Sequence, residues 1–420
     1  MEQAVAGGDL APGVRLPAVR DLAAAVEVSP ATVAAAYRTL RQRGFVVADR
    51  GRGTSVAAIP PVRVRSPGAL PAGVRDLASG NPDPGLLPPI AGVLRKLGAE
   101  HRLYGAPAKL PELVAIAEAG FAADGIGGDV AVTGGALDAI ERALQTELRM
   151  GDRVALEDPS WPRIGDLVGA LGFEIEPVAV DGHGLEPDAL DAALRRGARA
   201  VIATPRGQNP TGAALDPARG KALRAVLAAH PGVLAIEDDY VAGVAGAPYV
   251  PIHDRGGRWV VVRSLSKVVG PDLRLALVTG DALTVSRIEG RQRLGPGWVS
   301  HILQELAALI LAGDATAPLL ARAERTYAER RAALVDALAA HGIEATGDTG
   351  LGVWVPLADE AEAVRELLVR GWAVSPGERY RVRSPTGIRV TTARLEPADA
   401  LALADDIAGL GRAPAATYAG

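Results

Sequence analysis

The sequence contains no cysteine, and only four of its 45 basic residues are lysine. Without cysteine the chain has no disulfide, no thiolate nucleophile and no sulfur ligand for a metal. The six histidines are scattered, with no pair at helical spacing, so we expect no metal site. No apolar run approaches the roughly 18 residues of a membrane span, and no signal segment is evident. These absences predict a soluble, cytoplasmic protein.

A chain of 420 residues is too long for one ordinary core, so two or three domains are expected. Its net charge is -4, but the first 58 residues hold seven arginines against five acids, which suggests a polyanionic partner for this head. Proline and glycine are frequent just after it, which is typical of a linker. The predicted divisions are a head (1–58), a linker (59–75), a larger domain (76–300), a smaller domain (301–411) and a tail (412–420).

The head has the pattern of two helices and a hairpin. One helix is predicted after Pro17, and a second begins with Ser29 as N-cap and Pro30 at its first position, ending at Gly44. Two β-rich runs then flank a turn at 51–53. This order predicts a winged helix-turn-helix. The residues expected on the buried faces of the two helices are Leu22, Ala25, Val26, Val33, Ala36, Tyr37 and Leu40.

The remainder alternates short apolar runs with amphipathic segments such as 136–149 and 217–229, which predicts an α/β domain around a mostly parallel sheet. After about 300, a helical region, two short strands and a helix near 397–409 predict a smaller α+β domain. The candidate strands are 130–133, 153–157, 174–178, 200–204, 233–238, 259–264, 275–280, 352–357 and 387–392.

One of the few lysines, Lys267, closely follows a predicted strand in "RSLSKVVGPDLRLALVTG". Arginine would serve equally for charge, but lysine can lose its proton and attack a carbonyl to form an imine. Ser264 and Ser266 flank this amine, and Arg274 precedes the next strand. The stretch therefore offers a nucleophile beside groups that suit a phosphate.

Other polar or aromatic residues also follow predicted strands, where open α/β sheets bind ligands. They could supply an acid for a ring nitrogen, hydrogen bonds, a stacking surface and a phosphate seat at a helix N-terminus. With Lys267, this set describes a site for pyridoxal phosphate. The residues are Asp238, Asp239, Tyr240, Asn209, Trp161, Gly135 and Ala136.

Residues 76–411 resemble fold-type I aminotransferases, with "YGAPAKLPEL", "EDPSWP", "NPTG", "EDDY" and "SLSKVVGPDLR" in family order. The resemblance implies that Lys267 carries the internal aldimine of pyridoxal 5'-phosphate and that Asp238 pairs with the pyridine nitrogen, Asp239 being the alternative. The catalytic set would be Lys267, Asp238 and Tyr240. Tyr240 and Asn209 would bind the ring oxygen, Trp161 would stack, and Gly135, Ala136, Ser264, Ser266 and Arg274 would seat the phosphate.

The same resemblance assigns two residues beyond the cofactor. Arg389, in "GIRVTTARL", matches the arginine that grips a substrate carboxylate, although an ion pair with a structural acid would be the ordinary alternative. Tyr104 matches a residue that reaches the cofactor of the partner subunit, which implies a homodimer. Leu137 and Asp138 depart from the phosphate turn of many relatives, where glutamines are found.

The head resembles the winged-helix domain of GntR regulators. That resemblance implies DNA contacts by Arg20, Ser29, Thr32 and Arg38 and, at the wing tip, by Arg52. Pro30 stands where relatives often have arginine, and the usual first helix is only partly present. Either the start is truncated or the head is less stable, so DNA affinity could suffer.

A GntR-type head joined to an aminotransferase-type body resembles the MocR family of transcriptional regulators over essentially the whole chain. The resemblance implies a head-to-tail homodimer that binds an operator in double-stranded DNA and senses an amine or amino acid through aldimine chemistry. An active aminotransferase with a degenerate head is the alternative, because Gly207 replaces the family's histidine. A third reading, a DNA-binding protein whose body only dimerises, is disfavoured by the intact Lys267.

Overall fold

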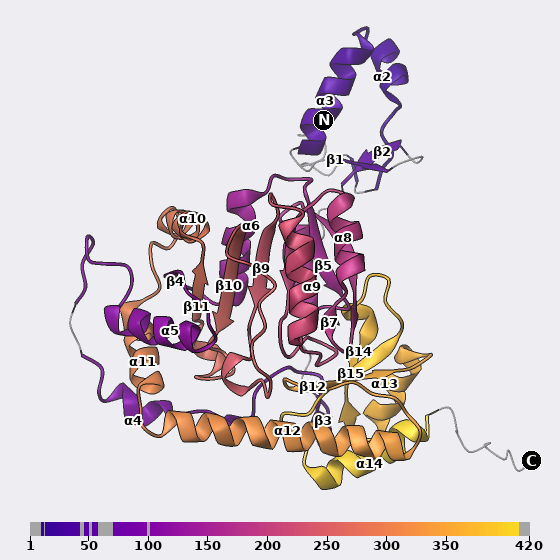
Figure 1. Cartoon of the computed structure of the whole chain (residues 1–420). Coiled ribbons are helices and arrows are strands. Elements are labelled where there is room, and N and C mark those ends of the chain that lie inside the picture. The colour runs from indigo at the N-terminus through magenta and orange to yellow at the C-terminus, as the bar shows by residue number, and fades with distance from the viewer. Residues whose placement is uncertain are drawn as a thin grey trace, which may run out of the picture.

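The computed structural model describes residues 10–11, 13–42, 46–49, 53–57, 70–98 and 101–410 (Figure 1). Element labels follow that figure and begin at α2. The described residues form two parts, a small N-terminal head and a large body.

The head contains α2 (Val19–Ala25), α3 (Pro30–Gln42) and an antiparallel hairpin of β1 (Val46–Asp49) and β2 (Gly53–Val56). The hydroxyl of Ser29 accepts the backbone N–H of Thr32 at 3.1 Å, so Ser29 caps α3 as predicted. The helix-turn-helix and hairpin are confirmed. Its core consists of Leu16, Ala23, Val33, Tyr37, Leu40, Val46 and Val56.

The predicted buried face of the first helix was partly wrong. Ala25, the last residue of α2, is exposed, and Val26, which follows the helix, is 52% exposed. The residue that packs inward is Ala23, with Leu22 against its edge. On α3, Ala36 is exposed although its neighbour Tyr37 is buried. The seven residues of α2 make too few turns for the helical period to fix its buried face.

The body is built on one eight-stranded sheet in the order β4-β11-β10-β9-β8-β5-β6-β7. Strands β6, β5, β8, β9 and β10 pair in parallel, while β11 runs antiparallel to both of its neighbours. The mostly parallel α/β sheet is therefore confirmed. The strands are β4 (Asp129–Thr133), β5 (Arg153–Asp158), β6 (Glu174–Asp181), β7 (Gly184–Leu185), β8 (Ala198–Ala203), β9 (Leu234–Asp238), β10 (Arg258–Ser264) and β11 (Ala276–Gly280).

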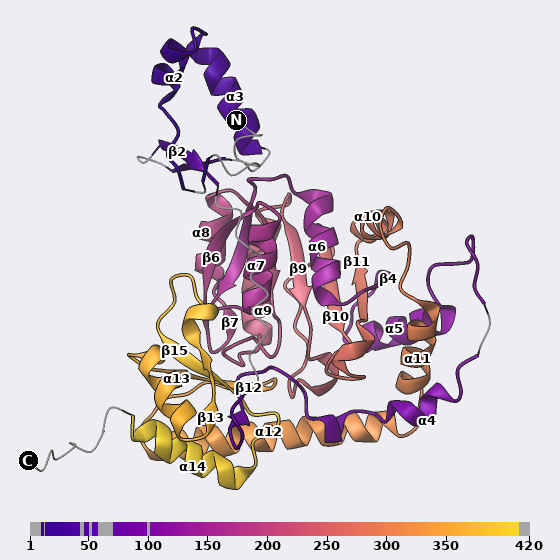
Figure 2. The ribbon, with the colours of Figure 1, turned by 180° about the vertical axis from the view of Figure 1, so that it is seen from behind.

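Helices cover both faces of this sheet (Figures 1 and 2). Side chains alternate along each strand, so on β10 Val260 and Val262 face one layer while Trp259 and Val261 face the other. One layer contains α6 (Ala136–Glu147), α7 (Pro162–Ala170) and α10 (Ala282–Arg293). The other contains α5 (Pro111–Ala123), α8 (Pro187–Arg195), α9 (Pro217–Ala228) and α11 (His301–Leu311).

A smaller part follows, with its own core. Its three-stranded sheet has the order β12-β15-β14, and a separate parallel pair joins β13 to β3, which comes from the chain just after the linker. The elements are β3 (Arg75–Asp76), β12 (Gly352–Pro356), α13 (Glu360–Val369), β13 (Trp372–Ala373), β14 (Ser375–Pro376), β15 (Gly387–Thr391) and α14 (Pro397–Ala408).

Helix α12 (Thr316–Ala340) joins the two parts of the body. Its first half places Ala323 and Tyr327 beside Val241, and its second half places Leu334 and Leu338 in the core of the smaller part. Helix α11 still packs on the large sheet, and β3 belongs to the smaller part's strands. The predicted division near residue 300 therefore stays a prediction.

Within the described ranges, no single helix is long and apolar enough to cross a membrane. Helices α11 and α12 reach that length and composition only as a pair, and they are bent by 78°.

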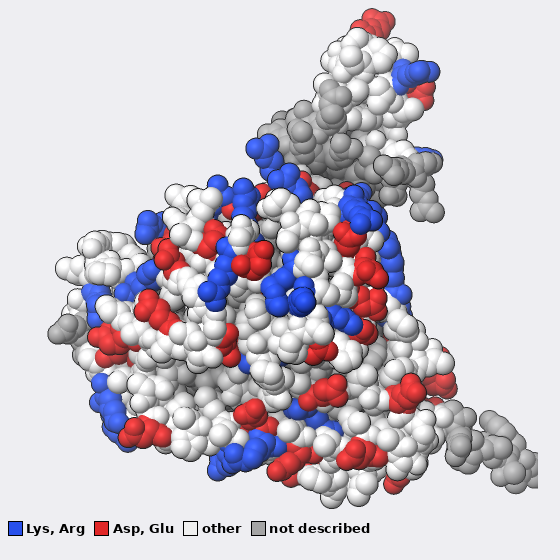
Figure 3. Space-filling model, in the orientation of Figure 1, with Lys and Arg blue, Asp and Glu red and all other residues white. Residues whose placement is uncertain are grey.

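Acidic and basic side chains are interspersed over the face of the body shown in Figure 3. Ion pairs at the surface of the body include Arg195 with Asp191 at 2.6 Å. Exposed pairs of this kind contribute about 0–1 kcal/mol each to stability. This face is thus mixed rather than of one sign.

Candidate cofactor and effector site

The predicted site residues of the body gather at the carboxyl ends of the parallel strands. Asp238 is the last residue of β9, and Lys267 follows the end of β10 by three residues. Arg389 comes from β15 of the smaller part, yet its charge lowers the pKa of Lys267. Residues from both parts of the body therefore meet at one edge of the large sheet.

Lys267 is partly buried, and its amine is hydrogen-bonded to a backbone oxygen, not to a carboxylate. Its Nζ donates to the carbonyl oxygen of Gly80 at 2.6 Å. Burial, followed by the nearby charge of Arg389, lowers the pKa of Lys267 to about 8. Part of the lysine is therefore a neutral amine near neutral pH, which is the form that attacks a carbonyl.

The two candidate acids of "EDDY" have different surroundings. Asp239 accepts hydrogen bonds from Arg206 at 2.8 and 2.9 Å and from Arg263 at 3.0 Å. Asp238 is 2% exposed, and its Oδ1 has no hydrogen-bond partner among the described residues. Consecutive strand residues point to opposite faces. This geometry favours Asp238 as the acid available to a ligand.

Asp238 is costly to bury as an anion. Burial, then the charges of Asp239 and Glu157, raises its pKa to about 7. A cationic ring nitrogen beside Asp238 would provide the partner that it lacks. Asn209 likewise has a buried Oδ1 without a partner among the described residues. These two unpaired oxygens fit a polar heterocycle such as pyridoxal phosphate.

Tyr240 follows Asp238 closely and is fixed by its hydroxyl, which donates to the carbonyl of Gly207 at 2.7 Å. Burial raises the pKa of Tyr240, so the phenol stays protonated at neutral pH. Gly207 has a φ of +65°, and a Cβ there would lie 2.6 Å from Val241. The glycine that replaces the family's histidine is thus required by the backbone here.

Two of the groups predicted to hold the phosphate meet at the start of α6. Gly135 is its N-cap with a φ of +110°, and a Cβ at this position would lie 2.8 Å from Nη2 of Arg274. A guanidinium and a helix N-terminus therefore converge where only glycine fits. The hydroxyl of Ser264 donates to that of Ser266 at 3.0 Å. Ala136 is the first residue of the helix.

Asp138, which departs from the usual phosphate turn, is already engaged. One of its carboxylate oxygens accepts the N–H of Gly134 at 2.9 Å, and the other pairs with Arg142 at 2.7 Å. Its charge is therefore largely compensated beside the phosphate seat.

The two predicted aromatic contacts differ in position. Trp161 is the N-cap of α7 and is partly buried against the core beneath α6 and α7. Tyr104 is 93% exposed, and its ring meets that of Trp298 edge-on, at 5.6 Å between centroids and 74°. Tyr104 therefore lies outside the site that this chain forms by itself, and its predicted role stays a prediction.

Arg389 is a buried cation, 5% exposed, with no ion pair among the residues that the structure describes. Its Nη1 lies 3.4 Å from the carbonyl oxygen of Ala78 and 3.3 Å from the hydroxyl of Tyr380. The alternative of an ion pair with a structural acid is not what the geometry shows. A buried guanidinium without an acid is suited to an anionic ligand.

Two functional neighbours were missed by sequence reasoning. Glu157, at the end of β5, accepts the N–H of Thr204 at 2.8 Å, and burial raises its pKa to about 7. Its charge acts on Asp238. The signal available was an acidic pair at a strand end in "EDPSW". Gly80, which accepts from Lys267, is 187 residues away in the chain and carried no such signal.

In the head, Arg20 and Thr32 are exposed and could reach DNA. The hydroxyls of Ser29 and Thr32 lie 2.8 Å apart, so both take part in capping α3. Arg38 lies in α3, but its side chain is not among those described, and Arg52 lies outside the described residues. The roles of these residues stay predictions.

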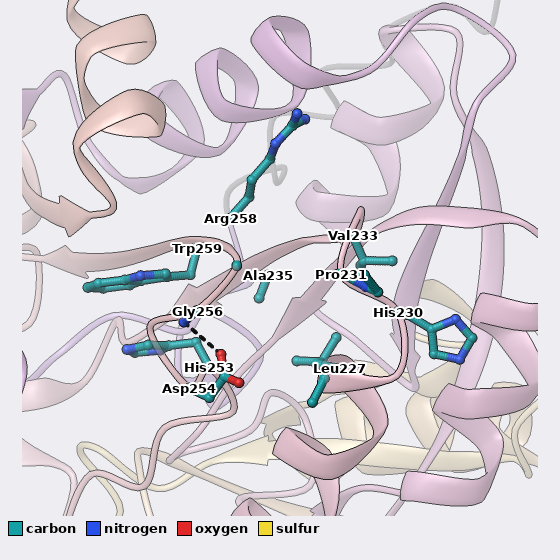
Figure 4. A pocket seen from close by; sticks show the side chains of 12 residues that line it. Leu227, His230, Pro231, Val233, Ala235, His253, Asp254, Gly256, Arg258 and Trp259 are labelled. Carbon is teal, nitrogen blue, oxygen red and sulfur yellow. Dashed lines mark hydrogen bonds between the residues drawn. The ribbon is translucent and has the colours of Figure 1, made fainter.

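A separate cavity of about 130 Å³ lies at the amino ends of β9 and β10 (Figure 4). The ring of His253 stacks on Trp259 there, with centroids 3.9 Å apart. His253 Nδ1 is 2.6 Å from Glu237, so this edge of the ring already has a partner. The cavity lies at the opposite strand ends from Lys267 and is not part of that site.

Fold and site together define a pyridoxal phosphate-binding body of the fold-type I class joined to a winged-helix head. Comparison with known families agrees. Residues 105–407 match the family described as aminotransferase class I and II, and residues 1–56 match the bacterial regulatory proteins of the gntR family.

Two curated regulators match the chain over most of its length. The chain is 38% identical over 416 residues to the vitamin B6 salvage pathway transcriptional repressor PtsJ of Salmonella typhimurium, which covers 97% of this chain and 96% of that protein. It is 29% identical to the HTH-type pyridoxine biosynthesis transcriptional regulator PdxR of Corynebacterium glutamicum, covering 80% of this chain and 76% of that protein. The Pyrococcus horikoshii kynurenine aminotransferase matches the fold, with a TM-score of 0.73, 21% identity, and coverage of 80% of this chain and 91% of that one.

The chain belongs to the MocR family of transcriptional regulators, in which a GntR-type head is fused to an aminotransferase-type body. It is accordingly a DNA-binding regulator whose cofactor is pyridoxal phosphate. When bound, this cofactor supplies an electrophilic carbonyl and an electron-withdrawing ring.

Proposed function

We propose that the body senses a small amine or amino acid at Lys267 and that the head conveys the result to an operator in double-stranded DNA. The observation that carries this proposal is Arg389, a buried cation without an acidic partner among the described residues, whose charge acts on Lys267. A carboxylate bound by Arg389 would place an attached amino group toward the lysine side of the site.

Each site residue then has a proposed task. Lys267 holds the cofactor covalently and yields its place to an incoming amine. Asp238 keeps the pyridine nitrogen protonated, and Trp161 supports one face of the ring. Asn209 binds the ring oxygen through its side-chain amide, and Tyr240 binds it by turning its hydroxyl proton from the carbonyl of Gly207 to that oxygen. The phosphate is held by Gly135, Ala136, Ser264, Ser266 and Arg274.

A segment that we call the strap, residues 76–87, connects this site with the head. The carbonyl of Gly80 binds Lys267, while Leu77 pairs through its backbone with Ala373 and Thr391 at 2.8 Å each. A cavity of about 310 Å³ borders the strap. Because the linker enters the body just before the strap, a change at Lys267 can bias the attachment of the head.

We further propose that the regulator is a cytoplasmic homodimer with the heads exchanged between subunits. Supporting this, large apolar side chains are exposed next to Tyr104 in the chain and on both sides of Trp298, whose ring meets Tyr104: Leu103 is 76% exposed, Leu294 82% and Ile302 62%. Apolar groups this exposed are typical of a surface that a partner covers. Such a dimer would bring Tyr104 to the partner's cofactor.

DNA binding should be sensitive to salt and depend on the head. Arg20→Ala and Arg38→Ala should each weaken retardation of a fragment from upstream of the protein's own gene by about tenfold, because each removes a phosphate or groove contact. The slope of log affinity against log salt should fall by about one per lost phosphate contact. Arg365→Ala, which changes an exposed arginine of α13, is the matched control. Equal losses in all three variants would contradict a role for the head.

The same assay distinguishes the possible signals. The relatives PtsJ and PdxR are named for vitamin B6 pathways, so the cofactor itself is a second candidate effector. A change in DNA affinity on adding pyridoxal phosphate alone would favour that reading, whereas a change that needs an added amino acid favours the amine. Steady amino-group turnover without any DNA binding would instead support the enzyme alternative.

Capture of the cofactor by the cofactor-free protein should depend on pH. The pKa of Lys267 is lowered from 10.5 to about 8, and only the neutral amine attacks a carbonyl, so the capture rate should rise up to about pH 8 and then level off. Arg389→Gln removes a positive charge that lowers this pKa, so its curve should move to higher pH. Stopped-flow absorbance measures both curves, and an unchanged midpoint in Arg389→Gln would refute the coupling.

A further inference from the structure

The end of β5 and the loop that follows it (159–160) bind the smaller part of the body, beginning with Asp158, the last residue of β5. This residue is 5% exposed, and its carboxylate accepts the backbone N–H groups of Val382, Arg383 and Ser384 at 2.8, 2.6 and 3.0 Å. It also accepts the hydroxyl of Ser384 at 3.0 Å. Four donors converge on one carboxylate, so Asp158 fixes the position of segment 382–384.

The residues on either side of Asp158 are anchored to the larger part. The side chain of Gln208 donates to the carbonyl of Pro159 at 2.7 Å, and Glu157 accepts from the backbone of Thr204. The loop also continues directly into Trp161 at the start of α7. Asp158 therefore connects a fixed edge of the large sheet to a segment of the smaller part.

The bound segment leads to Arg389 through Tyr380. The N–H of Ser160 donates to the carbonyl of Tyr380 at 2.8 Å, so the loop holds both ends of segment 380–384. Tyr380 is 7% exposed, and its hydroxyl lies 3.3 Å from Nη1 of Arg389 and 3.1 Å from the hydroxyl of Ser375. The position of the Tyr380 hydroxyl helps to set the direction of the guanidinium.

We propose that Asp158 is a positioning residue for carboxylate recognition: by holding segment 380–384 it orients Arg389, and it thereby gives the site its preference for amines that carry a carboxylate. This inference rests on the proposed function, since it names how that site selects its effector. Asp158 itself touches neither cofactor nor effector.

An aspartate is suited to this role because its four hydrogen-bond partners, three backbone N–H groups and one hydroxyl, are all donors. Charge-assisted hydrogen bonds of this kind are shorter and stronger than neutral ones. In Asp158→Asn one oxygen becomes an amide NH₂ that meets backbone N–H donors, so the segment must shift although the side chain keeps its size. The effect should appear at Arg389 and leave the phosphate seat at Gly135 unchanged.

The test uses two carbonyl reagents on the cofactor-loaded protein. Aminooxyacetate carries a carboxylate and O-methylhydroxylamine does not, while both form a C=N bond with the cofactor's carbonyl carbon and release the amine of Lys267. Decay of the visible band gives the rate for each reagent. The ratio of the two rates measures carboxylate recognition, separately from cofactor binding and from general reactivity.

Wild-type protein should favour aminooxyacetate, and Asp158→Asn should lower the ratio of rates about tenfold with an unchanged starting spectrum. Asp166→Asn, an exposed aspartate on α7, should keep the wild-type ratio. An unchanged ratio in Asp158→Asn would overturn the inference. If wild-type protein itself shows no preference, the proposed function fails first and the inference with it.

A second variant covers the case in which Asp158→Asn does not fold. Tyr380→Phe removes only the hydroxyl beside Arg389 and keeps the ring in its place. It should lower the same ratio several-fold, while the reaction with O-methylhydroxylamine stays at the wild-type rate. Equal slowing with both reagents, or no change with either, would contradict a path from Asp158 through Tyr380 to Arg389.

Discussion

Lys267→Ala should abolish the visible absorption band of the bound cofactor and, with it, every response of DNA binding to an added amine. The reason is chemical, because this lysine is the amine that the site offers to a carbonyl: it is partly buried, its pKa is lowered to about 8, and its Nζ faces a backbone carbonyl rather than an acid. Loss of the band should be complete, since no arginine nearby can replace an imine-forming amine.

The matched control is Lys221→Ala, which removes an exposed lysine of α9 and should leave the spectrum unchanged. Lys267→Arg is equally informative, because it keeps the positive charge and should still lose the band. A band that persists in either Lys267 variant would place the covalent link elsewhere and overturn the site as we propose it.

Asp238→Asn should have effects of opposite sign on the two forms of the protein. In the cofactor-free form, burial and the charges of Asp239 and Glu157 make an ionised Asp238 unfavourable, so a neutral isostere should raise the free energy of unfolding by roughly 1–4 kcal/mol at pH 8. In the loaded form the ring nitrogen loses its anionic partner, and cofactor affinity should fall on the order of 100-fold.

The pH dependence follows from the direction of the shift. The pKa of Asp238 in the folded protein, about 7, is above its usual 3.8, so the wild type loses stability relative to the variant as pH rises between these values. Denaturant unfolding at pH 5.5 and pH 8 should show a larger gain for Asp238→Asn at pH 8. Asp188→Asn, an exposed residue of α8, should show neither effect. A destabilised cofactor-free variant would refute this account of Asp238.

The strands and the local order of the body could be predicted because each strand is a short apolar run that ends at a polar motif. Lys267 follows β10 and Asp238 ends β9, at the carboxyl ends of the strands, where open α/β sheets bind ligands. The choice between Asp238 and Asp239 could not be made from the sequence. It depends on Arg206 and Arg263, which reach Asp239 from other elements.

Other features depend on contacts between segments far apart in the chain. Gly80 meets Lys267 across 187 residues, and Asp158 meets segment 382–384 across more than 220. No local period or motif encodes such pairs. The burial of Arg389 without an acid is also a tertiary property, because it requires knowing every neighbour that surrounds it. The first helix of the head was misread for the opposite reason, since seven residues carry too short a pattern.

Helix α12 limits how the body can change shape. Its 25 residues span about 38 Å without a break, from the core beside Val241 to the core of the smaller part. A continuous helix packed into a core at each end allows the smaller part of the body to tilt or turn about the helix. It resists separation of the smaller part from the larger part. Any movement that a bound effector causes at the strap would therefore be a change of angle between the two parts and not a change in their separation.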